Sequence, residues 1–250
     1  MFSLVGRTAV IAGGAGGLGT AVAQALSASG ARVGIADLDG EKARAVAAGI
    51  DGQARGYEVD VTNEASVEAM VESLESELGP IDIAIPAAGV GEVVKVIDMT
   101  YGQWRSMRAV HLDGTFLCIR KIIPGMLERG FGVLVCFSSI ASSQGVAGQV
   151  HYAAAKGGID GLVRSLAREM GARGVRINAI APGYFVSPLN DLAPPGRIEA
   201  LTENVPLGRF GDPAEIGALA VYLSSDEAAY LTGQVISPNG GFNYTSLMGD

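Results

Sequence analysis

The chain has 250 residues, of which 48% are hydrophobic and 18% are charged, and its formal net charge is −8. The negative charge disfavours binding to nucleic acids and anionic membranes, and no apolar run is long enough to span a bilayer. With two cysteines far apart and no N-terminal signal peptide, we expect a cytoplasmic protein that acts on a small molecule.

Short segments rich in valine and isoleucine alternate with longer segments that have apolar residues at helical spacing. A parallel connection needs a long crossover, so this alternation predicts a doubly wound α/β fold with a parallel sheet of about seven strands, helices on both faces, and a single domain over residues 1–250. We expect strands at Thr8–Gly13, Arg32–Asp37, Gly56–Asp60, Ile81–Ala87, Gly132–Ser138, Arg176–Pro182 and Gly233–Asn239. We expect the main helices at Leu18–Ser29, Glu64–Leu78, Tyr101–Arg129, Ala153–Gly171 and Pro213–Ser224.

Five glycines crowd the first strand-to-helix connection, in the stretch AVIAGGAGGLG from Ala9 to Gly19. They fit two dinucleotide-binding patterns, G-x-G-x-x-G from Gly14 and G-x-x-x-G-x-G from Gly13. Glycine permits a tight turn and a close approach of the backbone to a pyrophosphate, which the N–H groups at the start of the helix then face. A flexible loop is the alternative, but the position of the glycines favours the cofactor site of a Rossmann fold.

Asp37 ends the second expected strand. A carboxylate there accepts hydrogen bonds from both hydroxyls of an adenosine ribose and repels a 2′-phosphate, so it favours NAD over NADP. Leu38 and Asp39 follow it, with no arginine to bind a phosphate. The alternative role is a turn or cap carboxylate ahead of a helix that begins near Glu41.

The centre of the chain carries a candidate proton-transfer group. Tyr152 and Lys156 are four residues apart, so on a helix they lie on one face about one turn apart. An ammonium beside a phenol lowers the pKa of the phenol from about 10 towards the working pH, which suits proton exchange with an alcohol or carbonyl oxygen. Ser139, at the end of an expected strand, is placed to hold that oxygen. The Tyr–Lys spacing alone is common on helix surfaces.

Residues 184–206 follow the sixth expected strand, and we expect them to form a substrate lid because ligands of open α/β sheets bind at the carboxyl ends of strands. The lid is mostly apolar, which favours a hydrophobic or aromatic ketone or its secondary alcohol. Arg197 is its one candidate for an anionic group, so phosphorylated and dicarboxylic substrates are disfavoured. The expected pocket residues are Val146, Val150, Tyr184, Phe185 and Leu189. No H-E-x-x-H motif or cysteine–histidine cluster predicts a metal site.

Together these motifs resemble those of the short-chain dehydrogenase/reductase family, and the resemblance runs the length of the chain. Gly13, Gly17 and Gly19 match the family's glycine motif. The other matches are the adenine-contacting pair Asp60 and Val61, the catalytic Ser139 with the Y-x-x-x-K pair Tyr152 and Lys156, the Pro182–Gly183 segment with Ser187, and NGG at Asn239–Gly241.

The resemblance implies a nicotinamide-dependent oxidoreductase. Tyr152 would exchange the proton, Lys156 would lower the pKa of Tyr152 and bind the nicotinamide ribose, and Ser139 would hold the substrate oxygen. Relatives commonly pair the helices within residues 101–129 and 153–171 between subunits, which implies a homotetramer. The implied cofactor contacts are Gly13, Gly17, Leu18, Gly19, Asp37, Leu38, Asp60, Val61, Ala88, Gly89, Tyr152, Lys156, Pro182, Gly183 and Ser187.

Three positions depart from the family pattern. PAAG at Pro86–Gly89 replaces N-N-A-G, and Ala12 replaces a threonine that in relatives ties the glycine turn to that loop. His111 stands where the family has its catalytic asparagine. An imidazole donates and accepts hydrogen bonds as an amide does, so His111 is a candidate for the proton relay, with a pH dependence near its usual pKa of about 6.5. A buried packing histidine is the alternative.

The favoured function is hydride transfer between NAD(H) and a secondary alcohol or ketone. One alternative is an NADPH-dependent 3-oxoacyl thioester reductase, in which Arg129 and Arg173 would meet an acidic carrier protein, although Asp37 opposes NADPH. The other alternative is an NAD-binding protein without turnover, which the changes at His111 and PAAG suggest.

Overall fold

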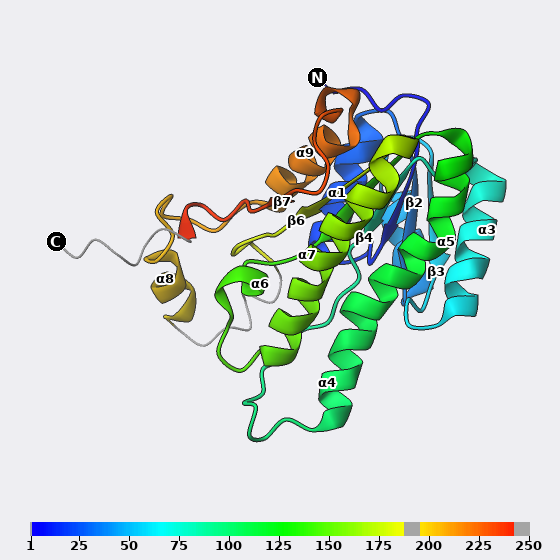
Figure 1. The fold of residues 1–250 in the computed structure, drawn as a ribbon. Coiled ribbons are helices and arrows are strands. Elements are labelled where there is room, and N and C mark those ends of the chain that lie inside the picture. Colours follow the sequence, from blue (N-terminus) through cyan, green and yellow to red (C-terminus); the bar gives the residue numbers. More distant parts are fainter. Residues whose placement is uncertain (1, 188–195, 243–250) are drawn as a thin grey trace.

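The computed structural model describes residues 2–187 and 196–242. Within them, seven parallel strands form one sheet in the order β3-β2-β1-β4-β5-β6-β7, which confirms the predicted doubly wound α/β fold (Figure 1). The order reverses between β1 and β4, the place where open α/β sheets have their ligand crevice. The strands are β1 (Thr8–Ala12), β2 (Arg32–Asp37), β3 (Ala54–Glu58), β4 (Ile83–Pro86), β5 (Gly132–Phe137), β6 (Val175–Ile180) and β7 (Val235–Ile236).

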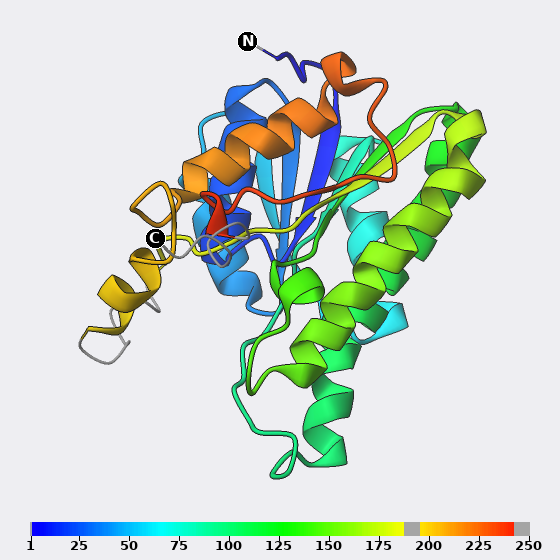
Figure 2. The same ribbon diagram turned by 60° about the vertical axis from the view of Figure 1, so that its left-hand side comes forward.

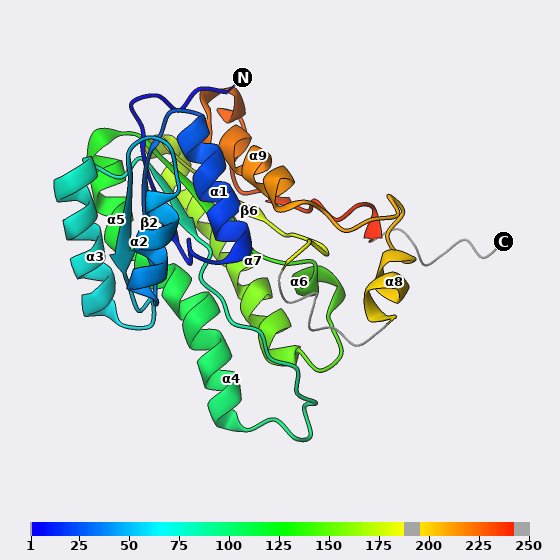
Figure 3. The same ribbon diagram turned by 180° about the vertical axis from the view of Figure 1, so that it is seen from behind.

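Helices cover both faces of the sheet because successive side chains of each strand point to opposite sides. On β1, Val10 packs into one apolar core and Ile11 into the other. The first core is completed by α3 (Glu64–Leu78), α5 (Gly114–Arg129) and α7 (Val150–Met170), and the second by α1 (Gly17–Ala28), α2 (Gly40–Ala48) and α9 (Pro213–Ser224). Figure 2 shows α9 and α7 on opposite sides of the sheet, and Figure 3 brings α1 and α2 to the front.

The expected helix at Tyr101–Arg129 is interrupted by a π-helical turn. It consists of α4 (Tyr101–Arg108), the turn η1 (Ala109–Asp113) and α5. The Gly114 N–H bonds to the Ala109 carbonyl five residues back, and the Thr115 hydroxyl donates to the His111 carbonyl at 2.7 Å. Such turns insert one residue into a helix and are frequent at functional sites.

Short helices complete the described chain. They are α6 (Ala141–Gln144), η2 (Gly171–Arg173), α8 (Arg197–Thr202) and η4 (Asp226–Ala228). Strand β7 has only two residues of the expected 233–239, and β3 begins two residues earlier than expected. In the described ranges, no helix combines the length and the apolar character that crossing a bilayer requires.

Candidate active site

A cavity of about 960 Å³ opens at the carboxyl ends of the strands. Loops that follow six strands, from β1 to β6, converge on it, as the strand order requires. The expected site residues that line it are Gly13, Gly17, Leu18, Gly19, Asp37, Leu38, Asp60, Val61, Ala88, Gly89, His111, Ser139, Val146, Tyr152, Lys156, Pro182, Gly183, Tyr184, Phe185 and Ser187. Leu189 lies outside the described residues.

Val150 is not among the described residues that line the cavity, so its assignment to the substrate pocket stays a prediction. It is the first residue of α7 and its side chain is 44% exposed. Two residues along a helix turn the direction of a side chain by about 200°, so Val150 points away from the side on which Tyr152 lies. Gln149, at the helix start, lines the cavity instead.

The glycine turn brings β1, α1 and the loop after β4 into close contact. Gly13 has a φ of +83°, and a Cβ atom there would lie 2.6 Å from the Cα of Ala88. A Cβ on Gly19 would collide with the Gly13 carbonyl oxygen, so α1 packs against the turn only with glycine at this position. Gly17, the first residue of α1, has no such neighbour and faces the cavity. The helix N-terminus is therefore open to an anion.

The backbone ties the glycine turn to the PAAG loop. The Ala87 N–H donates to the Ala12 carbonyl at 2.7 Å, and Gly13 packs directly on Ala88. The small side chains at positions 12, 87 and 88 permit this approach. The change from the family pattern thus leaves the two loops joined by main-chain contacts.

Asp37 is a turn carboxylate that lies at the cavity, its contact with a cofactor ribose stays a prediction, and the cap of α2 is Asp39. The Asp37 carboxylate accepts hydrogen bonds from the N–H groups of Ala15 at 3.1 Å and Asp39 at 3.3 Å, and it also lines the cavity. Lys42, on α2, lines the same end of the cavity. Lys42 carries no signal in the sequence next to Asp37, because it lies five residues further on, on a helix that turns back towards the strand end.

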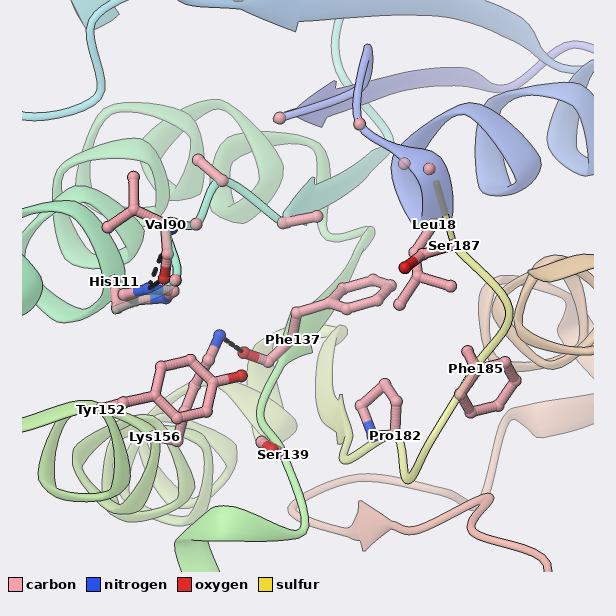
Figure 4. Close-up of a pocket in the computed structure, with 18 of the residues that line it drawn as sticks. Leu18, Val90, His111, Phe137, Ser139, Tyr152, Lys156, Pro182, Phe185 and Ser187 are labelled. Atoms are coloured by element: carbon pink, nitrogen blue, oxygen red, sulfur yellow. Dashed lines mark hydrogen bonds between the residues drawn. The ribbon is translucent and has the colours of Figure 1, made fainter. Parts of the chain in front are cut away.

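Tyr152, Lys156 and Ser139 come together as expected (Figure 4). Helix α7 carries Tyr152 and Lys156, and Ser139 follows β5. The Lys156 ammonium donates to the Phe137 carbonyl at 2.7 Å and lies 5.6 Å from the centre of the Tyr152 ring. No sequence signal identifies Phe137, because it acts through its main chain.

Burial dominates the ionisation of this group. It lowers the pKa of Lys156 from 10.5 to about 8 and raises the pKa of Tyr152, against the opposing effect of a side-chain hydrogen bond with Ser139. The expected lowering of the Tyr152 pKa is thus not found, because the desolvation of the phenolate outweighs its stabilisation. At neutral pH, the tyrosine is a phenol and the lysine an ammonium.

His111 lies buried in the π turn with its ring edge against the Tyr152 ring, 5.1 Å between centroids. Its Nε2 is 2.9 Å from the carbonyl oxygen and 3.1 Å from the nitrogen of Val90, while its Nδ1 has no partner among the described residues. Burial, followed by the charge of Lys156, lowers the pKa of His111 to about 4. The imidazole is therefore neutral at neutral pH, and the pH dependence expected near 6.5 does not apply.

The far end of the cavity, beyond Ser139, is mostly apolar. Arg197 on α8 is the one cation that the described residues contribute there. Phe210 stacks on Tyr184 with 5.4 Å between ring centroids. Other lining residues of this end that the sequence analysis did not name are Val90, Gly91, Val93, Gln149, Ile198 and Leu201.

The two arginines assigned to a carrier protein lie away from the cavity within one chain. Arg129 ends α5 and donates to the Ile81 carbonyl, just before β4. Arg173 lies in η2, just before β6. Both therefore lie at the amino ends of the strands, whereas the cavity lies at the carboxyl ends.

The chain is similar to known proteins over nearly its full length. Residues 13–243 match the family model described as enoyl-(acyl carrier protein) reductase. D-threitol dehydrogenase of Mycolicibacterium smegmatis is 39% identical over 96% of this chain and 94% of its own. 3-Oxoacyl-(acyl-carrier-protein) reductase FabG of Thermotoga maritima is 33% identical over 95% of this chain and 98% of its own. The crystal structure of gox2181, 34% identical, matches with a TM-score of 0.93 over 96% of this chain and 97% of that chain.

Proposed function

Because the chain belongs to the short-chain dehydrogenase/reductase family, it is an oxidoreductase, and we propose that it transfers hydride between NAD(H) and a secondary alcohol or ketone. The observation that carries the proposal is the convergence of Tyr152, Lys156 and Ser139 on one cavity with the glycine turn. The dehydrogenases and reductases among the relatives support the same chemistry.

The residues present fit a nicotinamide cofactor. Gly17 leaves open space at the N-terminus of α1 for a pyrophosphate, and Asp37 lies at the end of β2, where an adenosine ribose would bind. Lys156 would hold the nicotinamide ribose. When bound, the cofactor supplies or accepts the hydride.

The protein's own residues manage the proton and the substrate oxygen. In the direction of reduction, Ser139 donates a hydrogen bond to the carbonyl oxygen and Tyr152 donates its proton as charge develops there. The raised pKa of Tyr152 keeps the phenol protonated and ready to donate at neutral pH. The Lys156 ammonium, protonated below pH about 8, stabilises the phenolate that results.

Preference for NAD over NADP is the part of the proposal that depends on Asp37. Its negative charge repels a 2′-phosphate, whereas the ammonium of Lys42 at the same end would attract one. Asp37 lies on the strand end itself and is held there by the Ala15 N–H. We therefore assign the larger effect to Asp37.

The apolar far end of the cavity supports an aliphatic or aromatic ketone as the substrate. Tyr184, Phe185 and Phe210 contribute aromatic rings to this end. The lid at 184–206 remains a prediction, supported by the lining side chains of Ile198 and Leu201 from α8.

Absorbance at 340 nm tests the proposal. NADH and NADPH are each offered with aliphatic and aromatic ketones and with acetoacetyl-CoA. We expect turnover of ketones with NADH at least tenfold more efficient than with NADPH. Turnover of the thioester alone, with NADPH, would replace the proposal with the thioester reductase, and tight NADH binding without turnover would replace it with a cofactor-binding protein.

A further inference from the structure

His151 is a buried titratable residue that the proposed reaction does not use. It directly precedes Tyr152 in α7, and its side chain is 0% exposed. It is not among the described residues that line the cavity in which cofactor and substrate would bind. A buried imidazole needs hydrogen-bond partners at both ring nitrogens, and the partners of His151 connect two walls of the site.

The hydrogen bonds fix the proton on one nitrogen of His151. Its Nδ1 accepts from the Tyr152 N–H at 2.9 Å, so the neutral ring carries its proton on Nε2. Nε2 donates a hydrogen bond to Oε2 of Glu92, which lies 3.4 Å away. The Tyr152 N–H lies in the first turn of α7, where no helical carbonyl is available, and the N-cap residue Gln149 gives no side-chain bond. His151 therefore satisfies the main chain of Tyr152.

Glu92 also forms a hydrogen bond with the first turn of α4. Its other oxygen, Oε1, accepts from Nε2 of Gln103 at 2.6 Å, and Gln103 forms the capping box of α4 with Thr100. The Glu92 side chain is 38% exposed, so it reaches His151 from the surface loop that joins β4 to α4. Because of this bridge, the start of α7 and the start of α4 share one carboxylate.

The bridge joins the two segments that form one wall of the far end of the cavity. Val90 and Val93 come from the loop of Glu92, and Val146 and Gln149 from the segment before α7. One further backbone bond, from the Val94 N–H to the Gly148 carbonyl at 2.8 Å, runs between the same segments. Movement of the loop would therefore widen the cavity, while Nδ1 of His151 would still accept the hydrogen bond of the Tyr152 N–H.

We propose that the Glu92–His151 hydrogen bond is a specificity-determining link that holds the loop of residues 87–100 against the start of α7 and so sets the width of the substrate end of the cavity. Glu92 and His151 are positioning residues in this role. The proposal rests on the proposed function, because it takes this end of the cavity to be where the ketone binds.

Two variants break the link in different ways. Glu92→Ala removes the carboxylate, and His151→Asn keeps a side-chain acceptor beside the first-turn N–H groups but is too short to reach Glu92. Asp98→Ala is the matched control, because Asp98 is an exposed carboxylate of the same loop with no side-chain partner in the described chain. Amide hydrogen exchange of residues 90–94 and steady-state kinetics with the best ketone are measured for each variant.

We expect exchange at residues 90–94 to be at least fivefold faster in both variants. We expect KM for the ketone to rise about five- to tenfold while kcat stays within twofold, a split that general loss of folding would not produce. Asp98→Ala should match the wild type throughout. Unchanged exchange or unchanged KM in Glu92→Ala would overturn the inference. If the wild type reduces no ketone, the proposed function fails and the exchange measurement alone decides whether the link exists.

Discussion

Asp37 shows how one side chain serves both the fold and a candidate cofactor preference. One carboxylate oxygen holds the Ala15 N–H in the glycine turn, so replacing the residue with alanine would disturb the turn as well as the charge. An amide oxygen can accept the same hydrogen bond without the negative charge. Asparagine therefore separates the two roles.

We predict that Asp37→Asn shifts cofactor preference towards NADPH by about tenfold or more, because it removes the repulsion of the 2′-phosphate and leaves the attraction of Lys42. The measurement is kcat/KM for NADH and for NADPH with one ketone. The variant Lys42→Ala should shift the preference in the opposite direction. An unchanged ratio in Asp37→Asn would remove Asp37 from cofactor selection.

His111 occupies its position at the cost of unsatisfied hydrogen-bonding groups. One ring nitrogen lies within reach of both the N–H and the carbonyl of Val90 and can serve only one of them at a time, and Nδ1 has no described partner. An asparagine amide would serve both groups of Val90. The histidine also disfavours protonation, since its pKa of about 4 lies below the usual 6.5.

We predict that His111→Asn makes the protein more resistant to acid. Between pH 6.5 and 4, the unfolded wild type binds a proton at His111 that the folded protein does not, so the free energy of unfolding falls as the pH drops through this window. The variant loses this dependence, a relative gain of about 2 kcal/mol at pH 4.5. Urea unfolding at pH 7 and pH 4.5 measures it. Equal losses of stability on acidification in both proteins would contradict the assignment.

At the scale of the element, α1 starts so close to β1 that two of its glycines have different tasks. Gly19 is required for packing, because a Cβ atom would meet the Gly13 carbonyl. At Gly17, a Cβ atom would meet no protein atom within 4 Å and would project into the cavity. Gly19 is therefore needed for packing, whereas Gly17 is a candidate contact for the cofactor.

We predict opposite outcomes for Gly19→Ala and Gly17→Ala. Gly19→Ala should lower the free energy of unfolding by about 1 to 3 kcal/mol, the usual cost of forcing an atom into a packed site. Gly17→Ala should leave stability unchanged or slightly raised, since alanine favours a helix, yet weaken NADH binding at least tenfold. Thermal unfolding and NADH fluorescence titration give both quantities. Normal NADH affinity in Gly17→Ala would place the pyrophosphate elsewhere.

The periodicity of the sequence predicts the strands well but not the irregularities between them. Buried strands such as β1 and β5 appear as short apolar runs, and their bounds agree with the structure to within a residue at each end. The π turn at 109–113 adds one residue to the helix. The spacing of apolar residues in the sequence does not reveal this turn, because Met107 before it and Cys118 after it are both buried. The turn lies against a residue that is distant in sequence, since a Cβ atom on Gly114 would lie 2.8 Å from the Val61 side chain.

The site was predictable where a motif lies next to a strand end, and unpredictable where main-chain groups or distant loops contribute. The sequence places Ser139, Tyr152 and Lys156 through their motif. It gives no signal for the Phe137 carbonyl, which holds Lys156. Nor does it connect Glu92 with a histidine 59 residues away. Such contacts follow from the folded path of the chain rather than from residue type.

At the scale of the whole molecule, α5 and α7 leave an apolar hollow of about 380 Å³ on the outside of the protein. Phe116, on its rim, is 48% exposed. Pro124 of α5 and Leu162, Leu166 and Met170 of α7 line it with Ile119 and Ile123. The expected homotetramer, in which these helices pair between subunits, would cover this surface.

We predict that the wild type elutes as a tetramer, with a mass of about 102 kDa by light scattering, four times the chain mass of 25.6 kDa. Phe116→Glu should split it into smaller species, because a charge would be buried at the contact. Val5→Glu, at an equally apolar and 76% exposed position, should remain tetrameric. A monomeric wild type would refute the expectation.

In the proposed reaction Tyr152 exchanges the proton while the rest of the site binds and orients, and Tyr152→Phe removes the exchanging hydroxyl alone. We predict a loss of kcat of roughly 10²- to 10⁴-fold in both reaction directions, with NADH affinity within twofold of the wild type. Tyr57→Phe, which removes a hydroxyl outside the cavity, should keep its rate. A Tyr152→Phe variant that oxidises and reduces at the wild-type rate would show that another group exchanges the proton.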